Sequence, residues 1–345
     1  SAASDVYKRQ VAGLAESPDV LLRYGSDDWL RGLYMRLDIA AQTDTGRRKT
    51  KNEDYYGVYR EDTPGLKLFK EGALLVVADG LGGHIGGDIA SKLAVSIVRD
   101  ILKEDPPPAP TIHDEIDERD EGPLPLMRAA FAKANDSIFQ TNKDLVQGKR
   151  PMGTTVLAAQ IEPRKVYVAN IGDSRCYHIR DGEIIARTED HSWVDEQVKM
   201  GLMSKAEAET DRRKNIVTRC VGTHPDITVD TYRWHIVPGD MLLLCTDGLV
   251  NMISDSEIKA EFRKDGTAAD IAQRLVRLAN ENGGKDNITV VVACISPNPM
   301  RQIYLRTRSF FRRNRITIGW LIFMLFYGIA CAAAGYFAGL RRLFF

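Results

Sequence analysis

Residues 73–91, with the sequence ALLVVADGLGGHIGGDIAS, place one carboxylate between an apolar run and a glycine-rich segment. The run 73–78 predicts a buried strand, and apolar residues that recur at four-residue spacing from Ile89 predict a helix. Asp79 therefore lies at the end of a strand. The glycines after Asp79 have no side chains, so they leave space beside its carboxylate and let the backbone approach a ligand closely.

Three other segments repeat this arrangement of an acid at the end of an apolar strand. Their acidic and amide residues are Glu53, Asp54, Asp247, Asp286 and Asn287. A single aspartate at a strand end is usually a turn former or a helix cap. Several such carboxylates at one end of a sheet are harder to explain in that way. Burying them unpaired is costly, so a cluster of them requires cations.

The ligands that these segments offer are all oxygen atoms. There is no cysteine and no pair of histidines among them, so they suit Mg²⁺ or Mn²⁺ better than Zn²⁺. Two such ions about 3.5–4 Å apart can activate a water molecule and hold both ends of an in-line displacement at phosphorus. The glycine-rich segment does not have the spacing of a nucleotide-binding loop.

Strand and helix signals alternate across residues 32–300. Nine segments rich in Val, Ile, Leu and Tyr predict strands. They are residues 32–43, 55–59, 73–78, 154–161, 165–171, 175–180, 183–188, 240–246 and 287–295. Short turns join several neighbours, which favours antiparallel sheets over repeated βαβ units. Helices are expected from Ile89 onward, over 124–145, and near 255–264 and 267–283.

The charge of the chain is divided between an acidic body and a basic tail. The 345 residues have no net formal charge, but the last 45 hold eight arginines and no acid. The remaining residues include 39 bases and 47 acids, a net charge of −8. This argues against nucleic acid as the main partner, because binding the phosphate backbone needs clustered lysine and arginine. The five widely spaced cysteines indicate buried reduced thiols and argue against a disulfide framework.

Residues 316–340 are a run of 25 uncharged residues, which is long enough to span a bilayer as a helix. Trp320 near one end and Tyr336 and Phe337 near the other are typical of interfacial anchors. The alternative is a buried core helix, but such helices are usually shorter and carry a polar face. Six arginines precede the run and two follow it. The positive-inside rule therefore predicts a single-pass membrane protein with its large domain in the cytoplasm.

The expected organisation has five parts. They are an unassigned N-terminal leader (1–31), a catalytic domain (32–297), a basic juxtamembrane linker (298–315), a transmembrane helix (316–340) and a short tail (341–345). The basic linker would also contact anionic lipid headgroups.

Seven motifs occur in a fixed order between about residues 38 and 295. They are NED, VVADGLGGHIGGDIAS, MGTTV, NIGDSRCY, TEDHS, CTDGL and GGKDNITVV. As a set, they resemble the metal-dependent protein phosphatases of type 2C. Residues 190–222 resemble the bacterial branch, with its helical flap near the active site. The resemblance implies an α+β fold, a four-layer α/β/β/α sandwich of two antiparallel sheets flanked by helices. It also implies hydrolysis of phosphoserine and phosphothreonine in proteins.

The resemblance further assigns roles in the metal site. Asp79 matches the aspartate that bridges both metals, and the carbonyl of Gly80 matches a backbone ligand. Asp247 and Asp286 match ligands of one metal. The two remaining positions are Glu53, which matches an acid that serves the other metal through water, and its neighbour Asp54.

Four further positions match family residues around the metals. His84 stands where the family has a histidine proposed as general acid for the leaving alkoxide, a role that suits a pKa near working pH. The alternative is a histidine that only packs at the entry to the helix. Asp173 and the pair Thr154 and Thr155 match supporting groups, and Asn287 is expected to orient Asp286.

The sequence departs from the family at two places. The family usually has an arginine that grips the substrate phosphate, and here Lys49 stands at that position. Lysine is a point charge and loses the bidentate grip, so Lys49 is expected to bind phosphate with weaker orientation, or Arg48 or Arg47 to substitute. Many bacterial members also have an aspartate just before MGTT that helps to bind a third metal. Residues 149–151 are Lys-Arg-Pro here, which argues against that third site.

The first functional hypothesis is an active, membrane-anchored Ser/Thr phosphatase that uses two Mn²⁺ or Mg²⁺ ions. Its expected partners are phosphorylated proteins, such as a Ser/Thr kinase or its substrates, and membrane lipid. The second is a catalytically inactive relative that acts as a binding or regulatory module. A third is a membrane protein whose soluble part only positions partners. Inactive relatives normally lose metal carboxylates, and all five are present here, so the sequence favours the enzyme.

Overall fold

The computed structural model describes residues 35–60, 62–66, 68, 72–82, 86–102, 121–145 and 151–297. The chain separates into two compact units, Ser1–Ser296 and Pro297–Phe345, and nearly all described residues belong to the first. The expected leader, basic linker, transmembrane helix and tail lie outside these ranges. No helix within them is long and apolar enough to cross a membrane.

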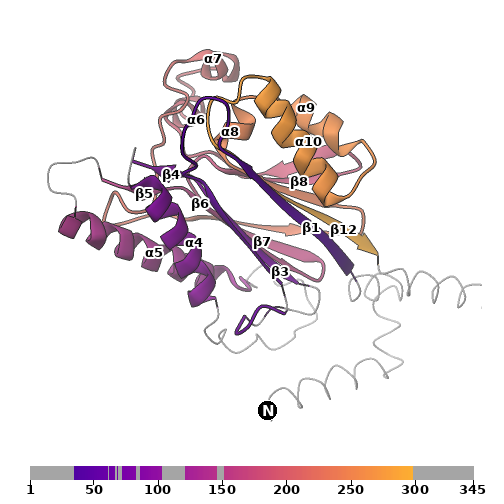
Figure 1. Cartoon of the computed structure of the whole chain (residues 1–345), viewed down its shortest axis with the longest axis horizontal. Coiled ribbons are helices and arrows are strands. Elements are labelled where there is room, and N and C mark those ends of the chain that lie inside the picture. The colour runs from indigo at the N-terminus through magenta and orange to yellow at the C-terminus, as the bar shows by residue number, and fades with distance from the viewer. Residues whose placement is uncertain are drawn as a thin grey trace, which may run out of the picture. The chain divides into compact units, whose positions relative to one another are not determined.

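Two five-stranded antiparallel sheets form the centre of the fold (Figure 1). The first sheet has the order β1 (Met35–Asp44), β12 (Ile288–Pro297), β11 (Met241–Cys245), β8 (Arg175–Arg180) and β9 (Glu183–Arg187). The second has the order β10 (Asp230–His235), β7 (Lys165–Ile171), β6 (Val156–Glu162), β3 (Ala73–Ala78) and β2 (Tyr55–Arg60). A small ladder pairs β4 (Gly80–Leu81) with β5 (Gly153–Thr154).

Each residue of β3 is buried because both faces of its sheet are covered. Successive side chains of a strand point to opposite faces. Leu75 and Val77 accordingly belong to the core between the two sheets. Leu74 and Val76 belong to the core under the helices. The continuous apolar run that opens the sequence argument is therefore the pattern of a strand packed on both sides.

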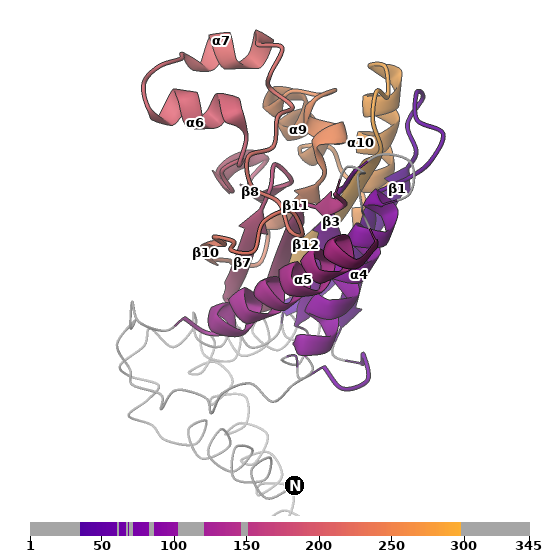
Figure 2. The ribbon, with the colours of Figure 1, turned by 90° about the vertical axis from the view of Figure 1, so that its left-hand side faces the viewer.

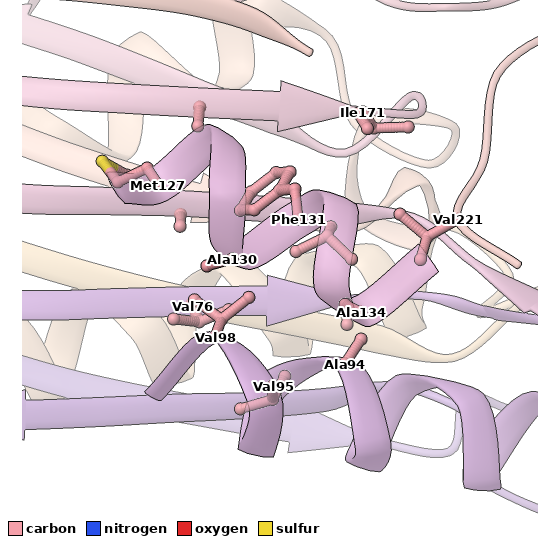
Figure 3. Close-up of a cluster of buried hydrophobic side chains, with 14 of the residues drawn as sticks. Val76, Ala94, Val95, Val98, Met127, Ala130, Phe131, Ala134, Ile171 and Val221 are labelled. Atoms are coloured by element: carbon pink, nitrogen blue, oxygen red, sulfur yellow. The ribbon is translucent and has the colours of Figure 1, made fainter. Parts of the chain in front are cut away.

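Helices cover the outer face of each sheet, which gives four layers (Figures 1 and 2). The second sheet carries α4 (Gly87–Ile101) and α5 (Leu124–Leu145), whose side chains Val98 and Phe131 pack above Val76 (Figure 3). The first sheet carries α9 (Asp255–Phe262) and α10 (Ala268–Glu281). Capping boxes at Ser254 and Thr267 satisfy the first backbone amides of α9 and α10. The four-layer sandwich is thus confirmed.

Several expected elements match the structure, and some differ. The strands at 73–78, 165–171 and 175–180 have the predicted bounds, and all four predicted helices are present. The strand expected at 154–161 is divided at Thr155, whose backbone N–H donates to the carbonyl of Asp79 instead of to a neighbouring strand. β10 was not expected; it is a partly exposed edge strand that pairs only with β7. Cys176, Cys220, Cys245 and Cys294 are free; Cys176 and Cys245 are buried as expected, whereas Cys220 and Cys294 are partly exposed.

A buried ionic cluster fixes the end of β8 to the start of β11. The Asp240 carboxylate accepts hydrogen bonds from Arg180 Nε at 2.7 Å and from the Val237 backbone N–H at 2.9 Å, and it lies 2.8 Å from His178 Nε2. Burial alone would raise the pKa of Asp240, but these hydrogen bonds outweigh it and lower the pKa to about 2. Trp234 stacks on His178 with ring centroids 5.9 Å apart.

We expect Asp240→Asn to lower the free energy of unfolding by about 2 kcal/mol, because it removes the charge from a buried carboxylate that is hydrogen-bonded to the partly exposed Arg180. The carboxylate stabilises the fold above its unfolded pKa of about 4, and this contribution is lost as the pH falls through its folded pKa. The difference between the two proteins should therefore shrink from pH 4 to pH 2. Urea unfolding followed by tryptophan fluorescence measures it.

Asp181→Asn is the matched control, because Asp181 is exposed in the adjacent turn and its positive φ of 52° is tolerated by asparagine. An equal loss of stability in both variants, or a difference that does not change with pH, would contradict the role of the Asp240 cluster.

Candidate active site

Antiparallel pairing brings the acids of the second sheet to one edge. β2 and β3 are neighbours, with Tyr55 opposite Ala78. The start of β2 and the end of β3 therefore lie side by side. Glu53 and Asp54 precede β2, and Asp79 follows β3, so all three carboxylates share this edge.

The first sheet also carries acids at one edge, and this edge lies next to the acidic edge of the second sheet. β11 and β12 are antiparallel neighbours, so Asp247 after β11 and Asp286 before β12 also share an edge. The Thr246 hydroxyl donates to Asp54 Oδ2 at 2.9 Å, which links the two edges directly. Asp247 is the first residue of α8 (Asp247–Val250). The site lies at the end of the sandwich where α8 and α6 are labelled in Figure 1.

Two threonines hold the backbone around Asp79. The Thr155 hydroxyl accepts from the Asp79 N–H at 2.9 Å, and the Thr154 hydroxyl donates to the Asp79 carbonyl at 2.8 Å. Gly80 pairs with Thr154, and a Cβ on Gly80 would lie 2.2 Å from the carbonyl oxygen of Gly87. Only glycine fits there, because the start of α4 passes so close. These contacts give Thr154 and Thr155 the supporting role that the sequence predicts.

Asn287 fixes the segment that carries Glu53. Its side-chain oxygen accepts from the Glu53 N–H at 2.8 Å, and its side-chain nitrogen donates to the carbonyls of Thr45 and Lys51. Its backbone N–H donates to Asp286 Oδ1 at 2.8 Å. The backbone N–H of Asn287 thus contacts Asp286, whereas its amide side chain binds the Glu53 segment, which the sequence did not indicate. That Asn287 orients Asp286 stays a prediction.

Three carboxylates at this edge each have one buried oxygen without a hydrogen-bond partner. They are Glu53 Oε1, Asp54 Oδ1 and Asp247 Oδ1. Burial raises the pKa of Asp54 to about 7 despite hydrogen bonds from Thr289 and Thr246. Burial and repulsion by Asp286 raise the pKa of Asp247 to about 6. Buried unpaired carboxylate oxygens are costly, and divalent cations would satisfy them.

Asp79 and Asp173 also have raised pKa values. Burial and repulsion by Asp54 and Asp247 raise the pKa of Asp79 well above its usual range. Burial and repulsion by Asp247 and Asp190 do the same to the pKa of Asp173. Asp173 thus lies within electrostatic reach of the metal-ligand candidates, beside Ser174, whose hydroxyl is 2.8 Å from that of Thr155.

The oxygen ligands of the site are of the kind that hard divalent cations prefer. In this structure some of these oxygens contact other side chains of the protein. Among the described residues, no three His, Cys, Asp or Glu side chains converge on a single point closely enough to hold one ion. Asn251 Nδ2 donates to Asp247 Oδ2 at 3.0 Å, and Asp286 Oδ1 is paired with Lys49. Rotation of these side chains would free all-oxygen ligands of the kind that Mg²⁺ and Mn²⁺ prefer.

Lys49 lies at the rim of the carboxylate cluster. Its Nζ is 2.7 Å from Asp286 Oδ1. Burial would lower the pKa of Lys49, but Asp286, Asp79 and Glu53 outweigh it and raise the pKa. Arg48 is exposed. His84 lies outside the described residues, and so do the two basic residues at 149 and 150.

Sequence reasoning missed some residues that shape the site. Asn251 is four residues after Asp247, and this spacing on a helix could have identified it. The Ser91 hydroxyl donates to the Glu53 carbonyl at 2.7 Å, a contact between α4 and the β2 segment that no local pattern shows. Gly87 leaves room for Glu53, since a Cβ there would lie 3.0 Å from Glu53 Oε1.

The helices α6 (Trp193–Lys199) and α7 (Lys205–Thr210) project beside this edge (Figure 2). They correspond to the helical flap that the resemblance implies. A cavity of about 660 Å³ separates them from α8 and α9, and Asp173 and Asp247 are among the residues that line it. Two acids of the site, Asp173 and Asp247, therefore line this groove.

Comparison with known proteins identifies this arrangement. The family model described as protein phosphatase 2C matches residues 47–291. The chain belongs to the protein phosphatase 2C family. A serine/threonine phosphatase stp from Listeria monocytogenes is 35% identical over 256 residues, which cover 73% of this chain and 93% of that protein.

Solved structures of bacterial phosphatases agree with this membership. The S. agalactiae serine/threonine phosphatase aligns with a TM-score of 0.64 and 32% identity, over 75% of this chain and 99% of that one. The catalytic domain of the serine/threonine phosphatase PstP, in complex with 2 manganese ions, aligns with a TM-score of 0.61 and 30% identity, over 76% and 99%. The chain is therefore a protein serine/threonine phosphatase of a family that uses Mn²⁺ or Mg²⁺.

In the presence of a chelator, stability should fall as the pH rises from about 4 to about 7. The raised pKa values of Asp54 and Asp247 mean that the folded state binds more protons than the unfolded state in this window, so unfolding becomes easier as those protons leave. Added Mn²⁺ should reverse the trend, because cations favour the ionised carboxylates. Urea midpoints at pH 5, 6, 7 and 8 measure both.

In chelator, Asp54→Asn should weaken the fall of the urea midpoint with rising pH. Asp62→Asn, at an exposed position, should leave that fall unchanged. If the urea midpoint depends on pH in the same way with chelator and with Mn²⁺, these acids do not hold the metal.

Proposed function

We propose that this phosphatase hydrolyses phosphoserine and phosphothreonine through a water molecule activated by two divalent cations, Mn²⁺ or Mg²⁺. The observation that carries the proposal is the shared edge of the two sheets. Glu53, Asp54 and Asp247 each present a buried oxygen there that lacks a partner. Such an edge is costly to the fold unless cations complete it.

The residues of the site would act as metal ligands or as supports of the backbone. Asp79, the Gly80 carbonyl, Asp247 and Asp286 would hold the ions directly, and Glu53 would do so through water, with Asp54 beside it. When bound, the ions supply positive charge that lowers the pKa of a water molecule and stabilises charge on the transferring phosphoryl group. Thr155 and Asn287 keep the backbones of Asp79 and Glu53 in place, so little reorganisation is needed during the reaction.

Lys49 would bind the phosphate of the substrate. Its ammonium group contacts Asp286 at 2.7 Å, and it is free to move to a phosphate oxygen once a cation neutralises that carboxylate. Arg48 is the alternative donor. His84 would donate a proton to the serine or threonine oxygen as it leaves, a task for which an imidazole is suited near neutral pH.

The inactive binding module remains the alternative function. All five metal-site acids are present and gathered at one edge: Glu53, Asp54, Asp79, Asp247 and Asp286. This supports catalysis, and no feature of the described residues favours the binding module.

Phosphate release from a phosphothreonine peptide tests the mechanism. The full chain should be active with Mn²⁺ and inactive with excess chelator, and Asp247→Asn should lower kcat by at least about 100-fold. The loss follows because a metal ligand acts on the transition state through the ion's charge. Asp62→Asn is the matched control and should keep full activity.

Activity that survives the chelator, or an Asp247→Asn variant as active as the control, would exclude the two-metal mechanism. A folded chain that is inactive with every metal would favour the binding module.

We also propose that residues 316–340 anchor the phosphatase at the cytoplasmic face of a membrane. Support comes from the uncharged run of 25 residues and from the arginines that flank it. A membrane-anchored Ser/Thr kinase, or proteins that it phosphorylates, are the substrates that such an anchor would favour, because both would meet at the bilayer.

Deletion of residues 301–345 should then slow dephosphorylation of membrane-associated phosphoproteins in cells, while kcat/KM for a peptide in solution stays within about twofold. Phosphopeptide quantification after fractionation of the cells measures the first effect. A deletion that leaves the cellular rate unchanged, or a protein found in the soluble fraction with its tail intact, would exclude the anchor.

A further inference from the structure

Two lysines without an acidic partner converge on a small cavity beside Asp286. Lys214 lies on the segment that follows α7, and Lys285 directly precedes Asp286. Both line a cavity of about 90 Å³. Its other lining residues are Asn215, Gly248, Asn251, Met252 and Asp286. No ion pair or side-chain hydrogen bond involves either lysine within the described part of the chain.

Several lysines elsewhere on the described surface are paired with an acid, although the exposed Lys133 on α5 is not. Lys51 pairs with Asp88 at 2.7 Å, and Lys199 pairs with Glu189 at 2.6 Å. Even Lys49, at the rim of the metal site, is engaged by Asp286. Lys214 and Lys285 therefore bring two positive charges to a cavity whose one acidic lining residue, Asp286, is already paired with Lys49, and an anion is the ligand that suits it.

The small cavity adjoins the groove that leads from the metal site. Lys214, Asn251 and Met252 line both the 90 Å³ cavity and the 660 Å³ groove under α6 and α7. Asp247, a candidate metal ligand, lines the groove as well. A polypeptide in the groove, with its reacting phosphate at Asp247, would pass next to Lys214.

We propose that Lys214 and Lys285 form a subsite for a second phosphate group on the same polypeptide. The inference rests on the proposed function and deepens it: the preferred substrates are segments phosphorylated at two closely spaced residues. A phosphate dianion matches the charge of two ammonium groups, and Lys214 lines both the small cavity and the groove, so a second phosphate on a polypeptide in the groove would meet it. An extended chain advances about 3.3 Å per residue and points alternate side chains to the same side, so the test places the second phosphate two residues from the first.

Acidic residues elsewhere in the groove restrict where a second phosphate can bind. Asp195 on α6 and Asp255 and Glu257 on α9 line the groove, and no ion pair engages these three carboxylates within the described residues. A second phosphate that faced them would be repelled. The enzyme should therefore favour a second phosphate on the side of the reacting residue that lies toward Lys214 and Lys285.

Steady-state kinetics of the full chain in detergent with Mn²⁺ test the subsite. The peptides share one sequence and carry one phosphothreonine, or a second one two residues before or after it, or glutamate at those positions. We expect kcat/KM to be about tenfold higher for one of the doubly phosphorylated peptides. Lys214→Ala and Lys285→Ala should each reduce that preference to about threefold or less, and Lys133→Ala, at an exposed position on α5, should retain it.

A binding measurement separates this inference from the proposed function. In Asp247→Asn, fluorescence anisotropy should show the same preference as a ratio of Kd values, and Lys214→Ala should abolish it. Equal binding of singly and doubly phosphorylated peptides would overturn the subsite even if the enzyme is active. Glutamate peptides as good as the doubly phosphorylated ones would overturn the assignment to phosphate. A retained binding preference in a chain that hydrolyses nothing would leave the subsite standing and refute the proposed function alone.

Discussion

Burial of several carboxylates side by side is the constraint on which the rest of the site depends. Asp54, Asp79, Asp173 and Asp247 all have pKa values above their usual range, because each is buried near other acids. A fold that only sought stability would not gather them. The sandwich tolerates the cluster because its three apolar cores lie elsewhere, between the sheets and beneath the two helical layers.

Hydrogen bonds with uncharged groups hold these acids in place. Thr155 holds the Asp79 backbone, Asn287 holds the Glu53 backbone, and Thr246 reaches from the first sheet to Asp54 in the second. None of these groups adds charge, so they position the carboxylates without neutralising them. The oxygens thus remain available for cations, which are the partners that the cluster lacks.

The strands and the acids at their ends could be predicted from the sequence because both are local signals. Strand β3 shows a continuous apolar run, and Asp79, Asp247 and Asp286 adjoin such runs. The supporting contacts could not be predicted, because the Asn287 side chain and the Glu53 N–H that it accepts are separated by 234 positions in the chain. The break at Thr155 and the edge strand β10 likewise arise from tertiary contacts that override a local pattern.

A lysine at position 49 suits a site in which Asp286 would exchange its contact with that lysine for a contact with a cation. An arginine could hold Asp286 through two parallel hydrogen bonds, whereas the lysine makes a single contact at 2.7 Å. A partly exposed contact of this kind contributes little to stability, so a phosphate can displace the carboxylate at small cost. The weaker grip on phosphate that follows would leave more of the substrate's binding to contacts outside the metal site. The positive charges of Lys214 and Lys285 are placed to supply them.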